Sequence, residues 1–212
     1  MMTRLIQAPM VPVRTVWRRR LADAYPISVT MFTRMVDQGI LRPDDRVELI
    51  HGLLVKKMSM NSPHRIAKRK LFFALNQVVP PGYFVDEQAP VRTTDSVVEP
   101  DVMVLRGNPD DYFPEHALAS QTSLLIEVAD TSLADDRSKK KALYANEGVT
   151  NYWIVNLADL QIEAYTDPTG PSDTPTYRSR IDYRPGSSIP VVLDGREVGN
   201  FKVEDAFPKP NE

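Results

Sequence analysis

The stretch from Ser123 to Asn156 constrains the fold of this chain more than any other part of the sequence. It begins with an apolar run over residues 123–128 that one acid, Glu127, interrupts. A helical pattern follows over 135–147, and a second apolar run over 152–157 ends the stretch. This order predicts a strand–helix–strand unit with a right-handed crossover, whose parallel strands are buried on both faces. Because an unpaired buried carboxylate is costly, Glu127 must have a local partner or hold a metal.

The other elements predict one mixed α/β domain over residues 28–212, preceded by an N-terminal arm over 1–27 that is rich in Pro and Arg. A hairpin is expected around His51 and Gly52. Helices are predicted over 30–38 and 64–78, and strands over 83–92 and 97–105. A surface loop is expected over 108–121. Further along, residues 161–166 and 177–183 should form an antiparallel hairpin, and a short strand over 187–193 should precede a final turn over 198–207.

Composition narrows the range of partners. The net charge of −2 gives no overall basic surface, so any contact with nucleic acid must come from local patches such as 18–20, 68–70 or 139–141. The absence of Cys excludes disulfides, thiolate metal sites and thiol catalysis, which fits a reducing cytoplasm. No apolar run approaches the roughly 20 residues of a membrane span, and the N-terminus does not have the pattern of a signal peptide. We therefore expect a cytoplasmic protein with no membrane partner.

Two acids are candidate metal ligands, because Asp101 and Glu127 are each embedded in an apolar strand. Strands that follow one another in sequence are neighbours about two-thirds of the time, which would bring both carboxylates to one point at the sheet edge. Two hard oxygen ligands with room for water suit Mg²⁺ or Mn²⁺ beside a phosphate substrate. The alternative is that they are unrelated surface acids at strand ends.

Lys140 lies on the helix that follows the strand of Glu127. Its ammonium could orient or deprotonate an attacking water, or neutralise charge on a phosphate in the transition state. The alternative is a solvated lysine paired with Asp136 at i,i+4 spacing.

Other polar and aromatic residues in this unit have simpler interpretations. Tyr144, Tyr152 and Trp153 are expected in the core rather than stacked on bases. Ser132 is expected to cap the helix in the pattern Ser-x-x-Asp.

Four stretches together resemble the Uma-two family of restriction-endonuclease-like proteins, in the PD-(D/E)XK nuclease superfamily, over residues 27–207. The specific one runs from Ile126-Glu127-Val128 through Lys140 and Tyr144 to Gly148-Val149 and Tyr152-Trp153. The others are Val47 to Gly52, Ser62-Pro63-His64, and Glu99-Pro100-Asp101-Val102.

This resemblance implies a restriction-endonuclease-like fold and Mg²⁺-dependent hydrolysis of phosphodiester bonds in DNA. Asp101 and Glu127 match the two acids of the superfamily motif, with the Val128 carbonyl as a further ligand. Lys140 stands for the motif lysine. Glu48 matches a glutamate of the N-terminal hairpin and would be a further metal ligand, directly or through a water. His64 would act beside the metal ligands or contact substrate, and the alternative is a surface histidine at the helix N-terminus. A homodimer would supply the two sites needed to cut both strands.

The sequence departs from the family pattern in two segments. His51 and Leu53 stand where the family often has acids, and Ala129-Asp130-Thr131 follows Val128 where the family often has Leu-Ser-Pro. Ala129 also stands where the parent superfamily motif has its lysine. Two alternatives to the nuclease therefore stay open. One is a catalytically silent, nuclease-shaped binding or assembly module. The other is a purely structural ion-pair cluster of the acids and Lys140.

Overall fold

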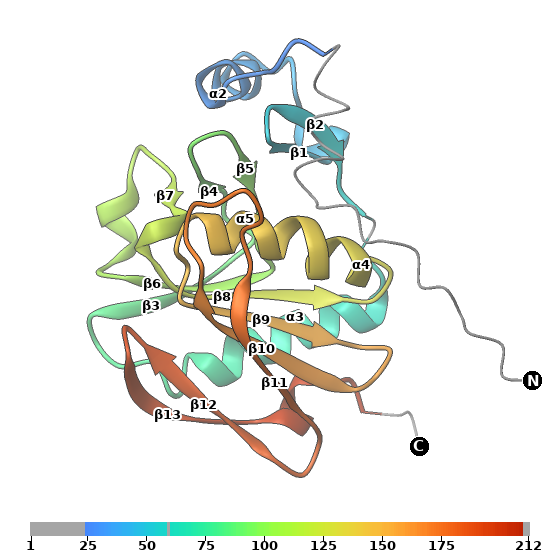
Figure 1. Ribbon diagram of the computed structural model, residues 1–212, viewed down its shortest axis with the longest axis vertical. Helices are drawn as coiled ribbons and strands as arrows, with labels where there is room; N and C mark the ends of the chain where they lie inside the picture. The colour runs from blue at the N-terminus through green and yellow to red at the C-terminus, as the bar shows by residue number, and fades with distance from the viewer. Residues whose placement is uncertain (1–23, 59, 210–212) are drawn as a thin grey trace, which may run out of the picture.

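The computed structural model describes residues 24–58 and 60–209, so most of the arm expected over 1–27 lies outside the described residues. A six-stranded sheet in the order β11-β10-β9-β8-β6-β3 forms the centre of the molecule (Figure 1). Its strands are β3 (Tyr83–Glu87), β6 (Val102–Arg106), β8 (Thr122–Ala129), β9 (Asn151–Asn156), β10 (Gln161–Pro168) and β11 (Tyr177–Tyr183). The mixed α/β architecture expected from the sequence is confirmed.

The strand–helix–strand unit is also confirmed. Strands β8 and β9 pair in parallel, and every residue of both is buried. The crossover begins with a short turn, α4 (Leu133–Asp135), and continues through a π-helical turn, η4 (Asp136–Lys140), into α5 (Lys141–Asn146). The π-helical turn is a local widening of the helix that the regular 3.6-residue pattern does not predict.

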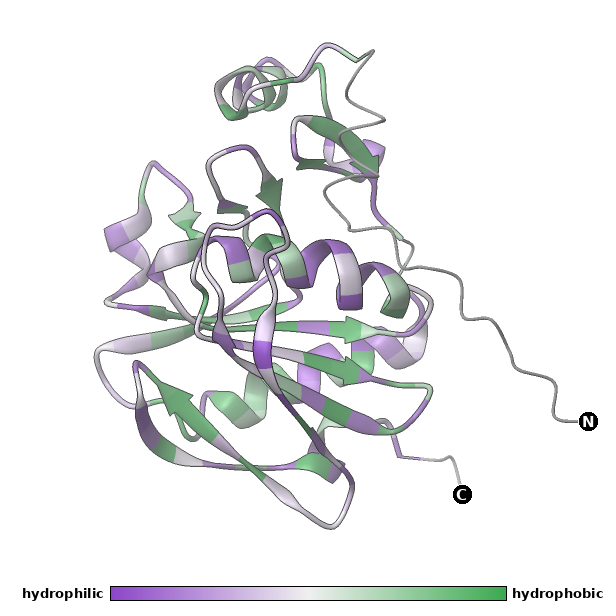
Figure 2. Ribbon diagram, in the orientation of Figure 1, coloured by the Kyte–Doolittle hydropathy of each residue, from purple (hydrophilic) through white to green (hydrophobic). Residues whose placement is uncertain are grey.

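The two faces of the sheet bury separate cores. One core is covered by α3 (Ser62–Leu75) and by the hairpin of β12 (Ser188–Leu193) and β13 (Arg196–Lys202), and it includes Leu71, Val128 and Trp153. The other lies against α5 and includes Leu125, Tyr144 and Tyr152. Hydrophobic colours run along the central strands in Figure 2, as expected for strands covered on both sides.

A smaller five-stranded sheet carries the N-terminal part of the domain, in the order β2-β1-β5-β4-β7. Its hairpin, β1 (Val47–Ile50) with β2 (Leu53–Lys56), turns through His51 and Gly52, both at positive φ, as the sequence predicted. Helix α2 (Val29–Asp37) packs on it through Phe32, and Ser28 caps that helix by accepting from the Met31 N–H. In Figure 1, α2 and the hairpin stand at one end of the molecule, above the crossover helix.

Three predictions about strands need correction. The strand expected over 83–92 divides into β3 and β4 (Val91–Arg92), because Gln88 takes a left-handed conformation and Pro90 cannot donate to a ladder. The strand expected over 97–105 divides into β5 (Val97–Val98) and β6, which belong to different sheets. The loop expected over 108–121 contains two 3₁₀ turns and β7 (Ala117–Leu118), which pairs in parallel with β4.

The C-terminal part follows the predictions more closely. Strands β10 and β11 form the expected antiparallel hairpin. The segment expected to be a final turn first forms β13, which pairs with β12, and then ends in the 3₁₀ turn η5 (Val203–Ala206). Among the described residues, no helix is long and apolar enough to cross a bilayer.

Candidate active site

A cleft of about 520 Å³ lies between the N-terminal elements and the end of the central sheet. We call its N-terminal side the roof: α2, the turn η1 (Pro43–Asp45) and the β1–β2 hairpin with the residues after it, up to Met60. We call the opposite side the floor: Asp101, Glu127, Asp136 and Lys140. The four residues proposed from the sequence to do the chemistry therefore face one cavity: Asp101, Glu127 and Lys140 from the floor, and Glu48 from the roof.

Asp101 lies between β5 and β6, just before the residue pair Val102–Ile126 of the β6–β8 ladder. The predicted neighbourhood of these strands is confirmed, and it brings Asp101 to the strand of Glu127. One Asp101 oxygen lies 2.8 Å from His64 Nε2, and the other accepts from the Val128 N–H at 2.8 Å. Asp101 is therefore held in place from two directions, by the first turn of α3 and by β8.

Glu127 has the local partners that its burial requires. Its Oε1 accepts from the Tyr144 hydroxyl at 2.7 Å and lies 2.9 Å from Lys140 Nζ. Tyr144 is fully buried, as expected for a core residue, but its hydroxyl contact with Glu127 was not predicted. The sequence did contain a signal for this contact. Tyr144 carries a hydroxyl and lies on the helix that follows the strand of the buried acid.

Glu48 joins the same site from the roof. Its Oε1 accepts from the Glu99 N–H at 2.8 Å and lies 3.8 Å from Lys140 Nζ. Lys57 approaches both Glu99, at 2.6 Å, and Glu48, at 3.9 Å. The side chains of Glu48 and Lys57 therefore connect the roof to the loop that carries Asp101.

Asp136 is a further member of the site. From the sequence it was expected only as an i,i+4 partner of Lys140, and Ser132 was expected to cap this helix. The Ser132 side chain makes no capping hydrogen bond to the backbone, and its hydroxyl instead donates to Asp136 Oδ2 at 2.6 Å. The Asp136 side chain is buried because the π-helical turn, which it begins, directs it into the cleft.

The acid cluster, which we define as Glu48, Asp101, Glu127 and Asp136, surrounds the one ammonium of Lys140. Burial works against the charge on Lys140, but the four carboxylates raise its pKa well above the usual value, so it stays protonated. The i,i+4 pairing of Lys140 with Asp136 is therefore not its main contact.

The same surplus of negative charge acts on the acids. Burial raises the pKa of Glu127 to about 8, despite the lowering effect of Lys140, and raises the pKa of Asp136 to about 6. Burial works to raise the pKa of Asp101 as well, but the hydrogen bond with His64 and the charge of Lys140 lower it overall. The four acids of the cluster therefore outnumber the ammonium groups near them, which are Lys140 and, beside Glu48, Lys57.

The chemistry of this donor set fits a hard divalent cation, because carboxylate oxygens are the ligands of Mg²⁺ and Mn²⁺ and a further cation would offset the excess of acids. In their present arrangement, no three His, Asp or Glu side chains among the described residues could hold an ion. Lys140 lies near both Glu127 and Glu48, where it serves as their counter-ion. The predicted Val128 carbonyl ligand stays a prediction, since the contact that Val128 makes with the site is through its N–H.

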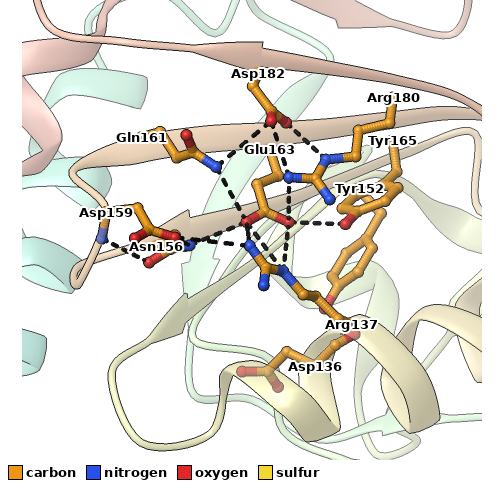
Figure 3. Close-up of polar contacts among 10 residues, drawn as sticks. All are labelled: Asp136, Arg137, Tyr152, Asn156, Asp159, Gln161, Glu163, Tyr165, Arg180 and Asp182. Carbon is orange, nitrogen blue, oxygen red and sulfur yellow. Dashed lines mark hydrogen bonds and ion pairs between the residues drawn. The ribbon is translucent and has the colours of Figure 1, made fainter. Parts of the chain in front are cut away.

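A second buried polar network anchors the helix turn that carries Lys140 (Figure 3). Its centre is Glu163 of β10, whose side chain is fully buried. Arg137 of η4 donates to Glu163 through Nε and Nη2, and Tyr165 donates to it at 2.7 Å. Tyr152 of β9 also donates to the Asp136 carbonyl at 3.2 Å. The π-helical turn is therefore fastened to the sheet on the side opposite to the cleft.

Comparisons with known proteins agree with this architecture. A family model described as "Uma2: Putative restriction endonuclease" matches residues 30–195. Among solved structures, a putative nuclease belonging to DUF820 from Anabaena variabilis ATCC 29413 is similar, with a TM-score of 0.62 and 16% identity over 86% of this chain and 98% of that chain. At that identity, the likeness shows the fold. No curated protein matches.

Proposed function

This chain belongs to the Uma2 family of restriction-endonuclease-like proteins, and from that premise we propose that it is a metal-dependent endonuclease that hydrolyses phosphodiester bonds in DNA. The observation that carries the proposal is the convergence of Asp101, Glu127 and Lys140 on the floor of one cleft. Asp101, Glu127 and Glu48, with the Val128 carbonyl, would hold Mg²⁺ or Mn²⁺. When bound, such an ion offsets negative charge on the phosphate and on the attacking and leaving oxygens.

The protein's own residues would orient the reactants. Tyr144 fixes the carboxylate of Glu127, and His64 with the Val128 N–H fixes that of Asp101. As an ammonium, Lys140 has protons to donate and no lone pair, so we assign it to orienting the water and stabilising charge on the phosphate. The water oxygen bonds to phosphorus while the bond to the leaving oxygen breaks. One proton of the water passes to solvent, and the leaving oxygen takes up a proton from solvent to become a hydroxyl.

The test is DNA cleavage by the purified protein with Mg²⁺ or Mn²⁺, compared with the variant Glu127→Gln. We expect cleavage that depends on metal and falls at least 100-fold in the variant. Glu197→Gln, a change to an exposed acid on β13, is the matched control and should cut at the parent rate. No cleavage by the parent, or equal cleavage by parent and Glu127→Gln, would refute the proposal. A homodimer, with one site for each strand, is part of the proposal and is tested by sedimentation.

A nuclease-shaped binding module is the second candidate. The observation in its favour is the position of Lys140 as the counter-ion of Glu48 and Glu127. The presence of His51 where family members often have an acid agrees with it. Calorimetry separates the two functions, because a module of this kind would release no heat with Mn²⁺ even at millimolar concentration, whereas the nuclease must bind the ion.

A further inference from the structure

The roof of the cleft above the proposed reaction centre carries cations. Arg42, Arg46 and Lys56 lie there, together with the acids Asp37 and Glu48, and the floor carries Asp101, Glu127 and Asp136 around Lys140. A polyanion in this cleft would meet these cations along the roof. They suit a nucleic acid strand that follows the roof and presents one phosphate to the floor.

Apolar side chains occupy the roof between these cations. Val36 and Met58 line the cleft and are 48% and 55% exposed, so both side chains are accessible to a ligand in the cleft. A guanidinium proton of Arg46 is donated to the Met58 carbonyl at 2.8 Å, which holds this part of the rim in place. Phosphates do not need apolar contacts, but the faces of unstacked bases do.

The depth of the reaction centre limits what can reach it. The side chains of Asp101 and Lys140 are 13% and 14% exposed, and that of Glu127 is 4% exposed. A phosphate must therefore pass below the roof to reach them. The cavity, about 520 Å³, falls within the range of about 300–1,000 Å³ that small-molecule pockets span.

The depth of the floor disfavours a duplex. The partner strand lies across a minor groove only about 6 Å wide, so a phosphate that reached Asp101 or Glu127 would carry that strand toward the roof. A single strand has no partner to collide with the roof, and its bases are free to turn away from one another.

We propose, on the basis of the proposed nuclease function, that the substrate is single-stranded DNA, in isolation or as an unpaired segment of a duplex. The nucleotide next to the reacting phosphate packs its base against Val36 and Met58, and Arg42, Arg46 and Lys56 hold the neighbouring phosphates.

The experiment compares one labelled 30-nucleotide sequence as a single strand, as a blunt duplex and as a duplex with a central unpaired segment. We expect the two substrates with unpaired nucleotides to be cut at least tenfold faster in Mn²⁺. Binding of the same three, measured by fluorescence anisotropy with Ca²⁺, should follow the same order. If the intact duplex is cut as fast or bound as tightly, the inference is wrong although the nuclease function stands. If nothing is cut, the nuclease proposal fails, and the order of binding still decides the strand preference.

Val36→Asp is the variant that tests the roof, and its matched control is Leu160→Asp, which places the same charge at an exposed turn outside the cleft. Val36→Asp should weaken single-strand binding at least tenfold and leave the heat of Mn²⁺ binding unchanged. Leu160→Asp should change neither. Melting followed by circular dichroism establishes that both variants are folded, and Met58→Asp replaces Val36→Asp if the latter is not. Equal single-strand binding by the parent and the folded roof variant would overturn the assignment of the apolar roof.

Discussion

Replacing Glu163 by Gln is expected to destabilise the fold by about 3 kcal/mol at neutral pH. Burial alone would raise the pKa of Glu163, but the hydrogen bonds from Arg137, Tyr165 and Asn156, with the charge of Arg180, lower it from 4.5 to about 2. A shift of one pKa unit corresponds to about 1.4 kcal/mol, which gives about 3 kcal/mol for the ionised form. Glutamine is uncharged, so it does not form an ion pair with Arg137. Its NH₂ group also places a hydrogen-bond donor where Glu163 has an acceptor oxygen.

The pH dependence of this loss is set by the direction of the shift. The folded protein releases the Glu163 proton more easily than the unfolded chain, so the stabilisation is complete above the unfolded pKa of 4.5 and is lost as the pH falls toward about 2. At pH 3, about 1.4 kcal/mol should remain. The difference between the parent and Glu163→Gln must therefore shrink by more than half between pH 7 and pH 3.

Urea unfolding of both proteins at the two pH values measures these differences, with Glu197→Gln as the exposed control. At pH 7 the melting temperature of Glu163→Gln should also fall by about 6–12 °C for a chain of this size. A loss below about 1 kcal/mol at pH 7 would refute the reasoning, because a partly buried surface pair contributes no more than that. A loss of equal size at both pH values would show that packing, rather than charge, is responsible.

Three further predictions concern the site and the core. Lys140→Met should reduce cleavage at least 100-fold. Mn²⁺ binding in calorimetry should stay intact or become tighter, because the change removes the internal counter-ion. Unchanged cleavage together with a loss of stability would favour the purely structural cluster. Asp101→Asn should abolish the heat of Mn²⁺ binding, and full retention of that heat would remove Asp101 from the ligand set. Gly199→Ala should cost about 1–3 kcal/mol in urea unfolding, because the new methyl group would collide with Val78. The second change Val78→Ala should restore most of that loss, and no restoration would contradict the steric explanation.

Local patterns predicted those elements whose conformation depends mainly on their own residues. The acid in the apolar run, Glu127, pointed correctly to a partnered buried carboxylate, since the cost of burying it alone is large. The pair His51-Gly52 indicated the hairpin turn. A two-residue turn between strands often needs positive φ at both positions, and glycine takes positive φ without strain.

Other features depend on tertiary contacts that no local pattern contains. The break between β5 and β6 places Asp101 at a junction of two sheets, which is visible only when the pairing of β5 with β1 is known. Asp136 is buried at the start of the π-helical turn, a local widening that the regular 3.6-residue pattern does not predict. The ion pair of Glu163 with Arg137 joins residues 26 positions apart.

The π-helical turn makes this site sensitive to chain length in a way that single substitutions would not reveal. Removing one residue between Asp136 and Lys140 would return the segment to a regular helix and rotate its N-terminal side against its C-terminal side by about 100°. Tyr144 could then stay in the core only if Asp136 turned away from the cleft and Arg137 turned away from Glu163. Insertions and deletions in these five positions should therefore be poorly tolerated, because each would change which side chains reach the cleft and which reach Glu163.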